Sequence, residues 1–301
     1  MDLREFPSID MSIPLRYCKP EVTEECFKYY EFQVMARTTF GGVAKKQGIK
    51  PGEEWKVMAS FNRASLEDML AEMDETGVDR CVMPAMKIWS RRDHAVSLNY
   101  KFADIAEVVK KSGGRIIGAA GYNPLRIQES LEEIETAVKE YGFRYVWFHP
   151  TSFGLSPNDK KCYPLYAKCV ELGIPVGYQS GHSAEPLTSE PGRPMYADEV
   201  VLDFPELTFL LTHTGYPWIE EWCDMVWKHP NVYGVMNAYF PSAWDPVQVR
   251  FMNSARGRSK VLCGSHGFGM TRFKKEFLEL SISDETKKAV LKDNAAKILK
   301  L

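Results

Sequence analysis

Eight short apolar runs, separated by segments with helical spacing, constrain the fold of this chain more than any other feature. The runs occupy residues 6–12, 78–85, 115–123, 143–150, 174–181, 207–215, 232–238 and 260–269. Most of them are continuously apolar, which is typical of parallel strands that are buried on both faces. Helical patterns between successive strands indicate βαβ units. We therefore predict an α/β fold, a TIM-like (β/α)8 barrel.

A doubly wound open sheet has the same alternation and is the structural alternative. It is disfavoured because no GxGxxG or GxxxxGK[ST] motif opens any helix. A long insertion follows the first strand at about residues 13–63, with an aromatic helical stretch at 26–40 and a turn-rich piece at 41–54. No shift in composition marks a linker. We predict a single barrel domain over residues 1–301 with a helical insertion after strand 1.

Composition limits the functional classes that are open to the chain. The formal net charge is −2 without a basic block, which argues against a nucleic-acid surface. No apolar stretch approaches the roughly 20 residues of a membrane span, and the charged N-terminus MDLREFPSID lacks the apolar core of a secretory signal. Seven scattered cysteines without a CxxC pair fit a reducing compartment. We predict a cytoplasmic protein that binds a small molecule.

Polar side chains stand where six of the predicted strands end. They are Ser12, His149, Gln179, His213, Asn237 and His266. The carboxyl ends of all strands of a (β/α)8 barrel meet on one face, so we expect these side chains to share one pocket. Imidazoles exchange protons near neutral pH, and amide N–H groups stabilise an oxyanion. The pattern therefore predicts an active site.

Four further residues extend the predicted pocket. His182, in the turn QSGHSAE, is a candidate for binding a substrate carboxylate together with His149, and Tyr178 is a candidate for an apolar wall. Arg16 and Arg37 are candidates for a bidentate clamp on an acidic substrate. A purely structural role stays open for each residue, most of all for the arginines. The aromatic insertion suits a cover over the barrel mouth or a subunit contact, and we predict a homo-oligomer.

The segment LTFLLTHTGYPWIEEWCDMVWKHPNVYGVMNA resembles the amidohydrolase superfamily, in the branch that includes aminocarboxymuconate-semialdehyde decarboxylase. Weaker matches follow in the expected order: FPSIDMS, FRYVWFHP, IPVGYQSG, KVLCGS and the ending DNAAKILKL. The resemblance implies a TIM barrel whose chemistry is hydrolysis or C–C cleavage at the carboxyl ends of the strands.

The resemblance also implies metal ligands that this chain replaces. The family's His-x-His falls on Ser12 and Pro14, its strand-five histidine on Gln179 and its strand-eight aspartate on His266, whereas its strand-six histidine is kept as His213. Zinc prefers His, Cys and carboxylate ligands, so we predict a protein without a cofactor. The alternative is a relocated zinc site, for which the ligands would be His149, His182, His213 and His266.

Three functions fit this pocket. The one we favour is a metal-independent hydrolase of a small carboxylated or cyclic lactone, ester or amide, with His266 as general base and with His213 and Gln179 polarising the carbonyl. The second is a decarboxylase or C–C lyase that acts on an aromatic or unsaturated carboxylic acid, with His213 or His266 as the proton donor. The third is a ligand-binding pseudoenzyme without turnover.

Overall fold

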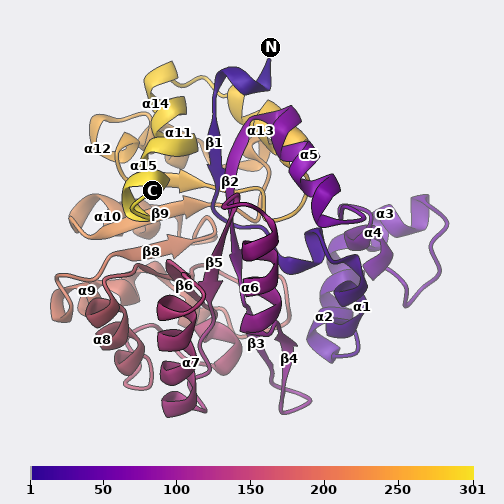
Figure 1. Ribbon diagram of the computed structural model, residues 1–301, viewed down its shortest axis with the longest axis horizontal. Coiled ribbons are helices and arrows are strands. Elements are labelled where there is room, and N and C mark those ends of the chain that lie inside the picture. The colour runs from indigo at the N-terminus through magenta and orange to yellow at the C-terminus, as the bar shows by residue number, and fades with distance from the viewer. Residues whose placement is uncertain (1) are drawn as a thin grey trace.

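The computed structural model describes residues 2–301 and contains one eight-stranded parallel sheet that curves into a nearly closed barrel (Figure 1). In their order of pairing the strands are β1 (Ser8–Asp10), β2 (Val78–Pro84), β5 (Ile116–Ala120), β6 (Tyr145–Phe148), β7 (Val176–Gln179), β8 (Phe209–Thr212), β9 (Val232–Met236) and β10 (Val261–Cys263). The first and last strands are joined by the Met11 N–H, which donates to the Cys263 carbonyl at 3.1 Å. The predicted barrel is confirmed.

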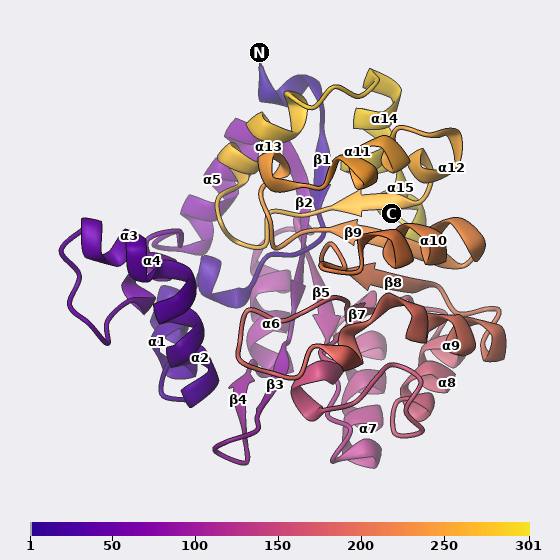
Figure 2. The same cartoon turned by 180° about the vertical axis from the view of Figure 1, so that it is seen from behind.

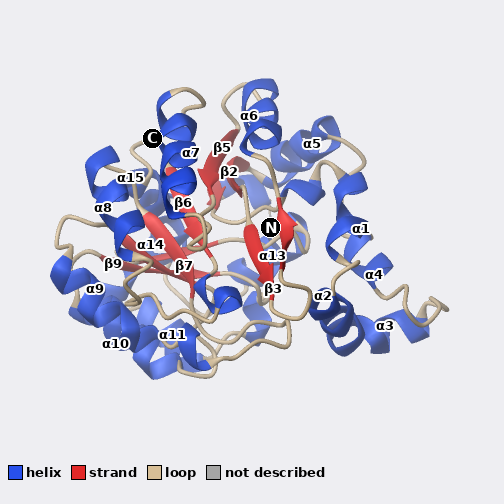
Figure 3. Cartoon of the chain, turned by 90° about the horizontal axis from the view of Figure 1, so that it is seen from below, coloured by secondary structure: helices blue, strands red, loops and turns tan. Residues whose placement is uncertain are grey.

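Helices surround these strands on the outside, as Figures 2 and 3 show. They are α5 (Leu66–Thr76), α6 (Phe102–Lys111), α7 (Ile127–Lys139), α8 (Tyr163–Leu172), α9 (Ala197–Asp203), α10 (Ile219–Lys228), α11 (Pro246–Met252), α12 (Ala255–Arg258), α13 (Met270–Leu278), α14 (Asp284–Lys288) and α15 (Asn294–Ile298). α5 begins directly after Ser65, which caps the helix because its Oγ accepts the Asp68 N–H at 3.1 Å. Within residues 2–301 no helix has the length and apolar character that crossing a membrane requires.

The strands are apolar because both of their faces are covered. Val146, Leu210 and Val261, from three different strands, are completely buried between the barrel interior and the outer helices. Strand polarity is the same throughout, so the carboxyl ends of all eight strands open on one face. Residues that follow the strands are thereby brought together, as the sequence predicts.

A two-stranded hairpin between β2 and α6 is missing from the predicted elements. β3 (Lys87–Ser90) pairs antiparallel with β4 (Ala95–Asn99). α6 begins at Phe102, shortly after this hairpin. Strands of four and five residues are too short to show a period of their own, so the sequence pattern does not separate β4 from the helix that follows it.

The insertion after β1 folds into short helices that lie together beside the barrel in Figures 1 and 2. They are α1 (Thr23–Cys26), α2 (Tyr30–Met35), α3 (Gly41–Lys46) and α4 (Trp55–Ala59). Residues 41–46, expected as a turn, are helical, because the chain continues from α2 through a π-helical turn at Ala36–Phe40.

A buried carboxylate fixes α2 against the hairpin. Glu31 Oε2 accepts the Ser90 hydroxyl at 2.7 Å, and Glu31 Oε1 accepts the Arg92 N–H at 3.0 Å. The Arg92 guanidinium also stacks on the Tyr30 ring, 4.3 Å from its centre. The insertion and the hairpin therefore form a joint wall next to the open face of the barrel.

Candidate active site

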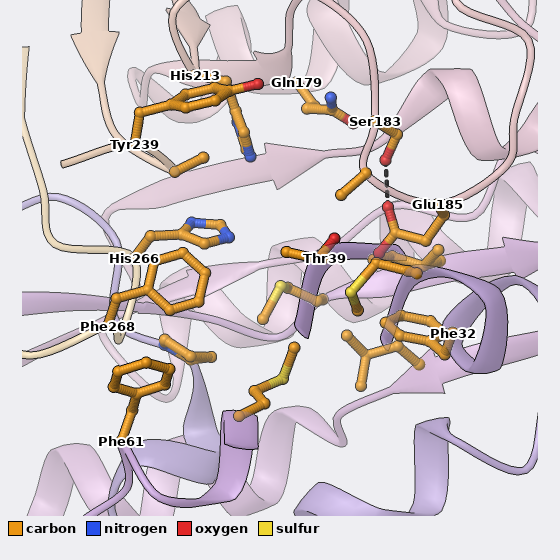
Figure 4. Close-up of a pocket in the computed structure, with 18 of the residues that line it drawn as sticks. Phe32, Thr39, Phe61, Gln179, Ser183, Glu185, His213, Tyr239, His266 and Phe268 are labelled. Carbon is orange, nitrogen blue, oxygen red and sulfur yellow. Dashed lines mark hydrogen bonds between the residues drawn. The ribbon is translucent and has the colours of Figure 1, made fainter. Parts of the chain in front are cut away.

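A cavity of about 580 Å³ opens at the carboxyl ends of the strands (Figure 4). Its wall joins strand ends to side chains from the insertion and the hairpin, so the insertion covers the barrel mouth. Most of the wall is apolar: Phe32, Met35, Phe40, Met58, Phe61, Ile88, Leu98, Trp147, Phe240 and Phe268. A cavity of this size and lining suits a small, largely flat molecule.

The structure places six of the ten predicted site residues on this cavity. They are Arg16, His149, Gln179, His182, His213 and His266. Two others lie directly behind the imidazoles: Ser12 Oγ is 3.2 Å from His266 Nδ1, and Asn237 Oδ1 accepts the His213 N–H at 2.6 Å. These two residues position the histidines and do not line the cavity themselves.

The remaining two predicted residues lie elsewhere. Tyr178 precedes Gln179 on β7, so its side chain points to the opposite face of the strand. It is fully buried against Phe209, and its hydroxyl donates to the Arg193 carbonyl at 3.3 Å. Arg37 is exposed and lines a separate cavity of about 520 Å³ within the insertion.

The amide of Gln179 is already engaged within the protein. Its Nε2 donates to the His182 carbonyl at 2.8 Å, and its Oε1 accepts the Thr151 hydroxyl at 3.4 Å. His182 Nε2 in turn lies 3.0 Å from the Tyr239 hydroxyl. Gln179 therefore supports the turn after β7, and only part of its donor capacity is free for a ligand.

Two histidines face each other because their backbones turn sharply at the ends of β8 and β10. His213 and His266 have φ values of 67° and 57°, in the left-handed region that is unfavourable for residues with a Cβ. Their ring centres are 5.0 Å apart. Residues held in such conformations concentrate at functional sites, where the surrounding structure compensates for the strain.

Burial keeps the cavity imidazoles uncharged. Loss of hydration lowers the pKa of His149 to about 4. Loss of hydration, assisted by the nearby Arg16 guanidinium, lowers the pKa of His266 to about 3. Burial, together with the neighbouring imidazoles, also places the pKa of His213 well below its ordinary value. At neutral pH these rings accept a proton or a hydrogen bond but supply no acidic proton.

This burial predicts a stability that depends on pH. The unfolded chain protonates His266 at about pH 6.5, whereas the folded protein does so only near pH 3, so stability falls as the pH drops through this window. The expected slope is about 1.4 kcal/mol per pH unit for each such histidine. We expect His266→Asn to reduce the slope of unfolding free energy against pH, measured by urea titration.

A matched control for this variant is available in the same chain. His94 has a similar backbone conformation, with φ 53°, but it is exposed. His94→Asn should leave the slope unchanged, because the His94 side chain is exposed and folding removes little of its hydration. Equal slopes for His266→Asn and the wild type would contradict the lowered pKa of His266 in the folded protein.

Arg16 is the buried cation of the cavity. Its side chain is almost completely buried, and its Nη1 donates to Asn62 Oδ1 at 2.6 Å. Within residues 2–301 no carboxylate lies within ion-pair distance of Arg16. A buried charge without a partner is costly, so a guanidinium in this state is suited to an anionic ligand.

Sequence reasoning missed several polar residues of the wall, and two of them stand in one turn. Ser183 and Glu185 follow His182 in the loop between β7 and α9, and both line the cavity (Figure 4). Both residues stand in the turn QSGHSAE. The acidic residue three positions after His182 is the sequence feature that could have indicated a polar wall here. Loop residues have no period that would tell whether they face a cavity or water.

A (β/α)8 barrel with a cavity at the carboxyl ends of its strands is the architecture of a TIM-barrel enzyme. The amidohydrolase family model matches residues 49–301, and the chain belongs to this family. No curated protein matches the chain significantly.

Solved structures share the fold over nearly the whole chain. An uncharacterised TIM-barrel protein from Bordetella bronchiseptica is 22% identical, with a TM-score of 0.72 and 98% of each chain covered. A 5-carboxyvanillate decarboxylase from Novosphingobium aromaticivorans, with bound manganese and a nitrobenzoic acid, is 18% identical, with a TM-score of 0.67 and coverage of 99% and 98%. A dihydroxybenzoic acid decarboxylase from a Polaromonas species, with manganese and 2-nitroresorcinol, is 17% identical, with a TM-score of 0.65 and coverage of 98% and 97%.

These structures correct the prediction that the protein has no cofactor. That prediction is wrong, because decarboxylases of this fold were crystallised with bound manganese. The residues of this chain do not supply an evident ligand set: the described part, residues 2–301, has no group of three or more His, Cys, Asp and Glu side chains that could hold a metal ion. The four histidines of the alternative zinc site thus do not form one, and we derive no reaction step through a metal.

Proposed function

We propose that the protein decarboxylates a small aromatic carboxylic acid. The observation that carries this proposal is the buried, unpaired Arg16 guanidinium in a cavity with mainly apolar and aromatic walls. A cation in such a cavity fits a flat molecule with one anionic end. The relatives of the same fold support this choice, because two of them are named as decarboxylases of aromatic acids. Decarboxylation therefore replaces hydrolysis as the favoured reaction.

Arg16 would bind the anionic oxygens of the acid, and the ring would lie against the phenylalanines of the wall. Phe61 and Phe268 pack edge to face with ring centres 5.6 Å apart, which fixes one side of the cavity. The neutral imidazoles of His213 and His266 accept hydrogen bonds, so they suit hydroxyl groups on the ring. Because the cavity is apolar, it also favours the loss of charge that accompanies release of CO2.

Hydrolysis is the second candidate, and one observation favours it. An unprotonated imidazole at neutral pH is the state that a general base requires, and His266 is in that state. The two reactions differ in their products, since a hydrolase incorporates one oxygen atom from water and a decarboxylase releases CO2.

The test uses the purified full-length protein with 5-carboxyvanillate and with 2,6-dihydroxybenzoate, in water enriched in oxygen-18. Each acid is incubated with and without manganese chloride, so that a metal lost in purification does not hide turnover. We expect loss of one carboxyl group, detected by mass spectrometry, without oxygen-18 in the aromatic product. Unchanged acids under all conditions would contradict the proposal for these substrates, and cleavage of an ester or lactone analogue with oxygen-18 incorporation would favour hydrolysis.

The single domain over residues 1–301 and the homo-oligomer stay predictions.

A further inference from the structure

Decarboxylation of an aromatic acid requires a proton at the carbon that loses its carboxyl group. Loss of hydration lowers the pKa of all four cavity imidazoles, so they do not supply it. Burial raises the pKa of the Cys26 thiol to about 12 and also raises the pKa of Tyr100, so both are weak acids here. The Arg16 guanidinium keeps its proton as well. The acid must therefore come from another residue of the wall.

Glu185 is the carboxyl group of this cavity. Figure 4 shows it across the cavity from His266. Within residues 2–301 no Lys, Arg or His lies within ion-pair distance of its carboxyl oxygens. Glu185 is partly exposed at the cavity wall. A carboxyl group that has lost part of its hydration and has no cation beside it retains its proton more readily than one in water.

The groups around Glu185 shift its pKa in both directions, and those that raise it prevail. Loss of hydration is the main cause that raises its pKa, and the Glu31 carboxylate on α2 adds to this, whereas the hydrogen bond from Ser183 opposes it. Its other titratable neighbours, Cys26 on α1 and His149 after β6, are uncharged. The pKa of Glu185 is therefore raised above that of an ordinary glutamate, and the protonated form extends to higher pH than it does in an exposed side chain.

A chain of hydrogen bonds decides which oxygen carries the proton. His149 Nδ1 accepts the Ser152 N–H at 3.2 Å, so the ring proton lies on Nε2, which donates to Ser183 Oγ at 3.3 Å. The Ser183 hydroxyl then donates to Glu185 Oε2. Because Oε2 accepts, the proton of the carboxyl group belongs on Oε1, for which the described residues offer no hydrogen-bond partner.

We propose that Glu185 is the catalytic acid that protonates the substrate carbon bearing the carboxyl group, with Ser183 and His149 as positioning residues. This inference rests on the proposed decarboxylation. Glu185 Oε1–H gives its proton to the ring carbon, and a ring electron pair forms the new C–H bond. The bond to the carboxylate then breaks, its electron pair returns to the ring, and CO2 leaves. Glu185 is left as a carboxylate and regains a proton from water.

The test compares Glu185→Gln, Glu185→Asp and wild type, with the exposed Glu190→Gln of the same loop as a matched control. Glutamine keeps the shape and a hydrogen-bond donor but has no transferable acidic proton. We expect Glu185→Gln to lower kcat by about a hundredfold to ten-thousandfold, the usual contribution of a general acid, with KM changed only a few-fold. Glu185→Asp should retain part of kcat, and Glu190→Gln should behave as wild type.

The pH profile gives a second readout. An acid must be protonated to act, so kcat/KM of the wild type should fall tenfold per pH unit above the raised pKa of Glu185. Glu185→Gln should lack this decrease, and Ser183→Ala should move it to a higher pH, because the hydrogen bond from Ser183 favours the ionised form.

Failure of the acid role is distinguishable from failure of the proposed function. If wild type releases CO2 and Glu185→Gln does so within a few-fold, Glu185 is not the acid although the function stands. If wild type releases no CO2, both proposals fail. The infrared difference spectrum between wild type and Glu185→Gln tests the proton directly, and a carboxylate band in place of a carboxylic acid band at neutral pH would overturn the inference by itself.

Discussion

Arg16→Met should raise KM for the aromatic acid about a hundredfold or more while kcat changes only a few-fold. A bidentate pair between a buried guanidinium and a carboxylate contributes about 3 kcal/mol or more, and each 1.4 kcal/mol corresponds to a tenfold change in affinity. The guanidinium binds the charged carboxylate of the substrate at least as strongly as the transition state, in which this group is leaving as CO2, so its loss affects KM more than kcat. The measurement is steady-state kinetics of CO2 release, supported by calorimetric titration of the acid.

Arg272→Met is the matched control for this prediction. Arg272 lines the same cavity, but it is exposed and its guanidinium stacks on the Phe240 ring, 3.7 Å from the ring centre. Its replacement should change KM only a few-fold, because exposed charges bind weakly. Arg16→Met should also have a Tm equal to or above that of wild type, since it removes a buried charge without a carboxylate partner. An unchanged KM for Arg16→Met would contradict the assigned orientation of the substrate.

Asp10→Ala should destabilise the protein by about 2 to 6 kcal/mol, at about 1 to 3 kcal/mol for each buried N–H left without a partner. Asp10 Oδ1 accepts the Ser12 N–H at 3.0 Å, and the Asp10 carboxyl oxygens accept the Ser265 N–H at 3.1 and 3.0 Å. These bonds join the ends of β1 and β10, where the barrel closes. His266 follows Ser265 directly, so the substitution should also displace its imidazole. Urea unfolding of the purified variant measures the loss.

Asp10→Asn is the control that keeps the shape and one acceptor oxygen. Oδ1 can still accept both N–H groups, whereas the new Nδ2 no longer accepts the Ser265 N–H. We expect Asp10→Asn to retain most of the stability. Equal destabilisation by the two substitutions would show that these hydrogen bonds do not hold the closure.

The repeating part of this fold could be predicted from sequence, and the connections could not. Each strand is an apolar run because it is buried on both faces. The polar residues of the site stand at the ends of β6, β7, β8 and β10, where these apolar runs stop. The clustering of His149, His213 and His266 follows from strand polarity alone. Hairpin β3–β4 and the helix at residues 41–46 lie in connections, where no repeating pattern separates one local structure from another.

The candidate site, like the fold, could be predicted from sequence at the strand ends but not in the loops. Tyr178 was predicted to line the cavity, but successive side chains of a strand point to opposite faces. Gln179 points into the cavity, so Tyr178, the residue before it, points away from it. Glu185 was missed because its position depends on a loop that returns over the barrel mouth. The cofactor prediction failed for another reason: counting replaced ligands in one sequence does not reveal what relatives of the same fold bind.

Release of labelled CO2 tests the central claim most directly. The wild-type protein, supplied with manganese chloride, is given 2,6-dihydroxybenzoate or 5-carboxyvanillate with carbon-13 in the carboxyl groups, and the gas phase is followed by mass spectrometry. We predict steady evolution of labelled CO2 that depends on enzyme concentration and is strongly reduced in Arg16→Met at low substrate concentration. No labelled CO2 above the protein-free control, while the acid binds saturably, would contradict decarboxylation and leave a binding protein or a different reaction.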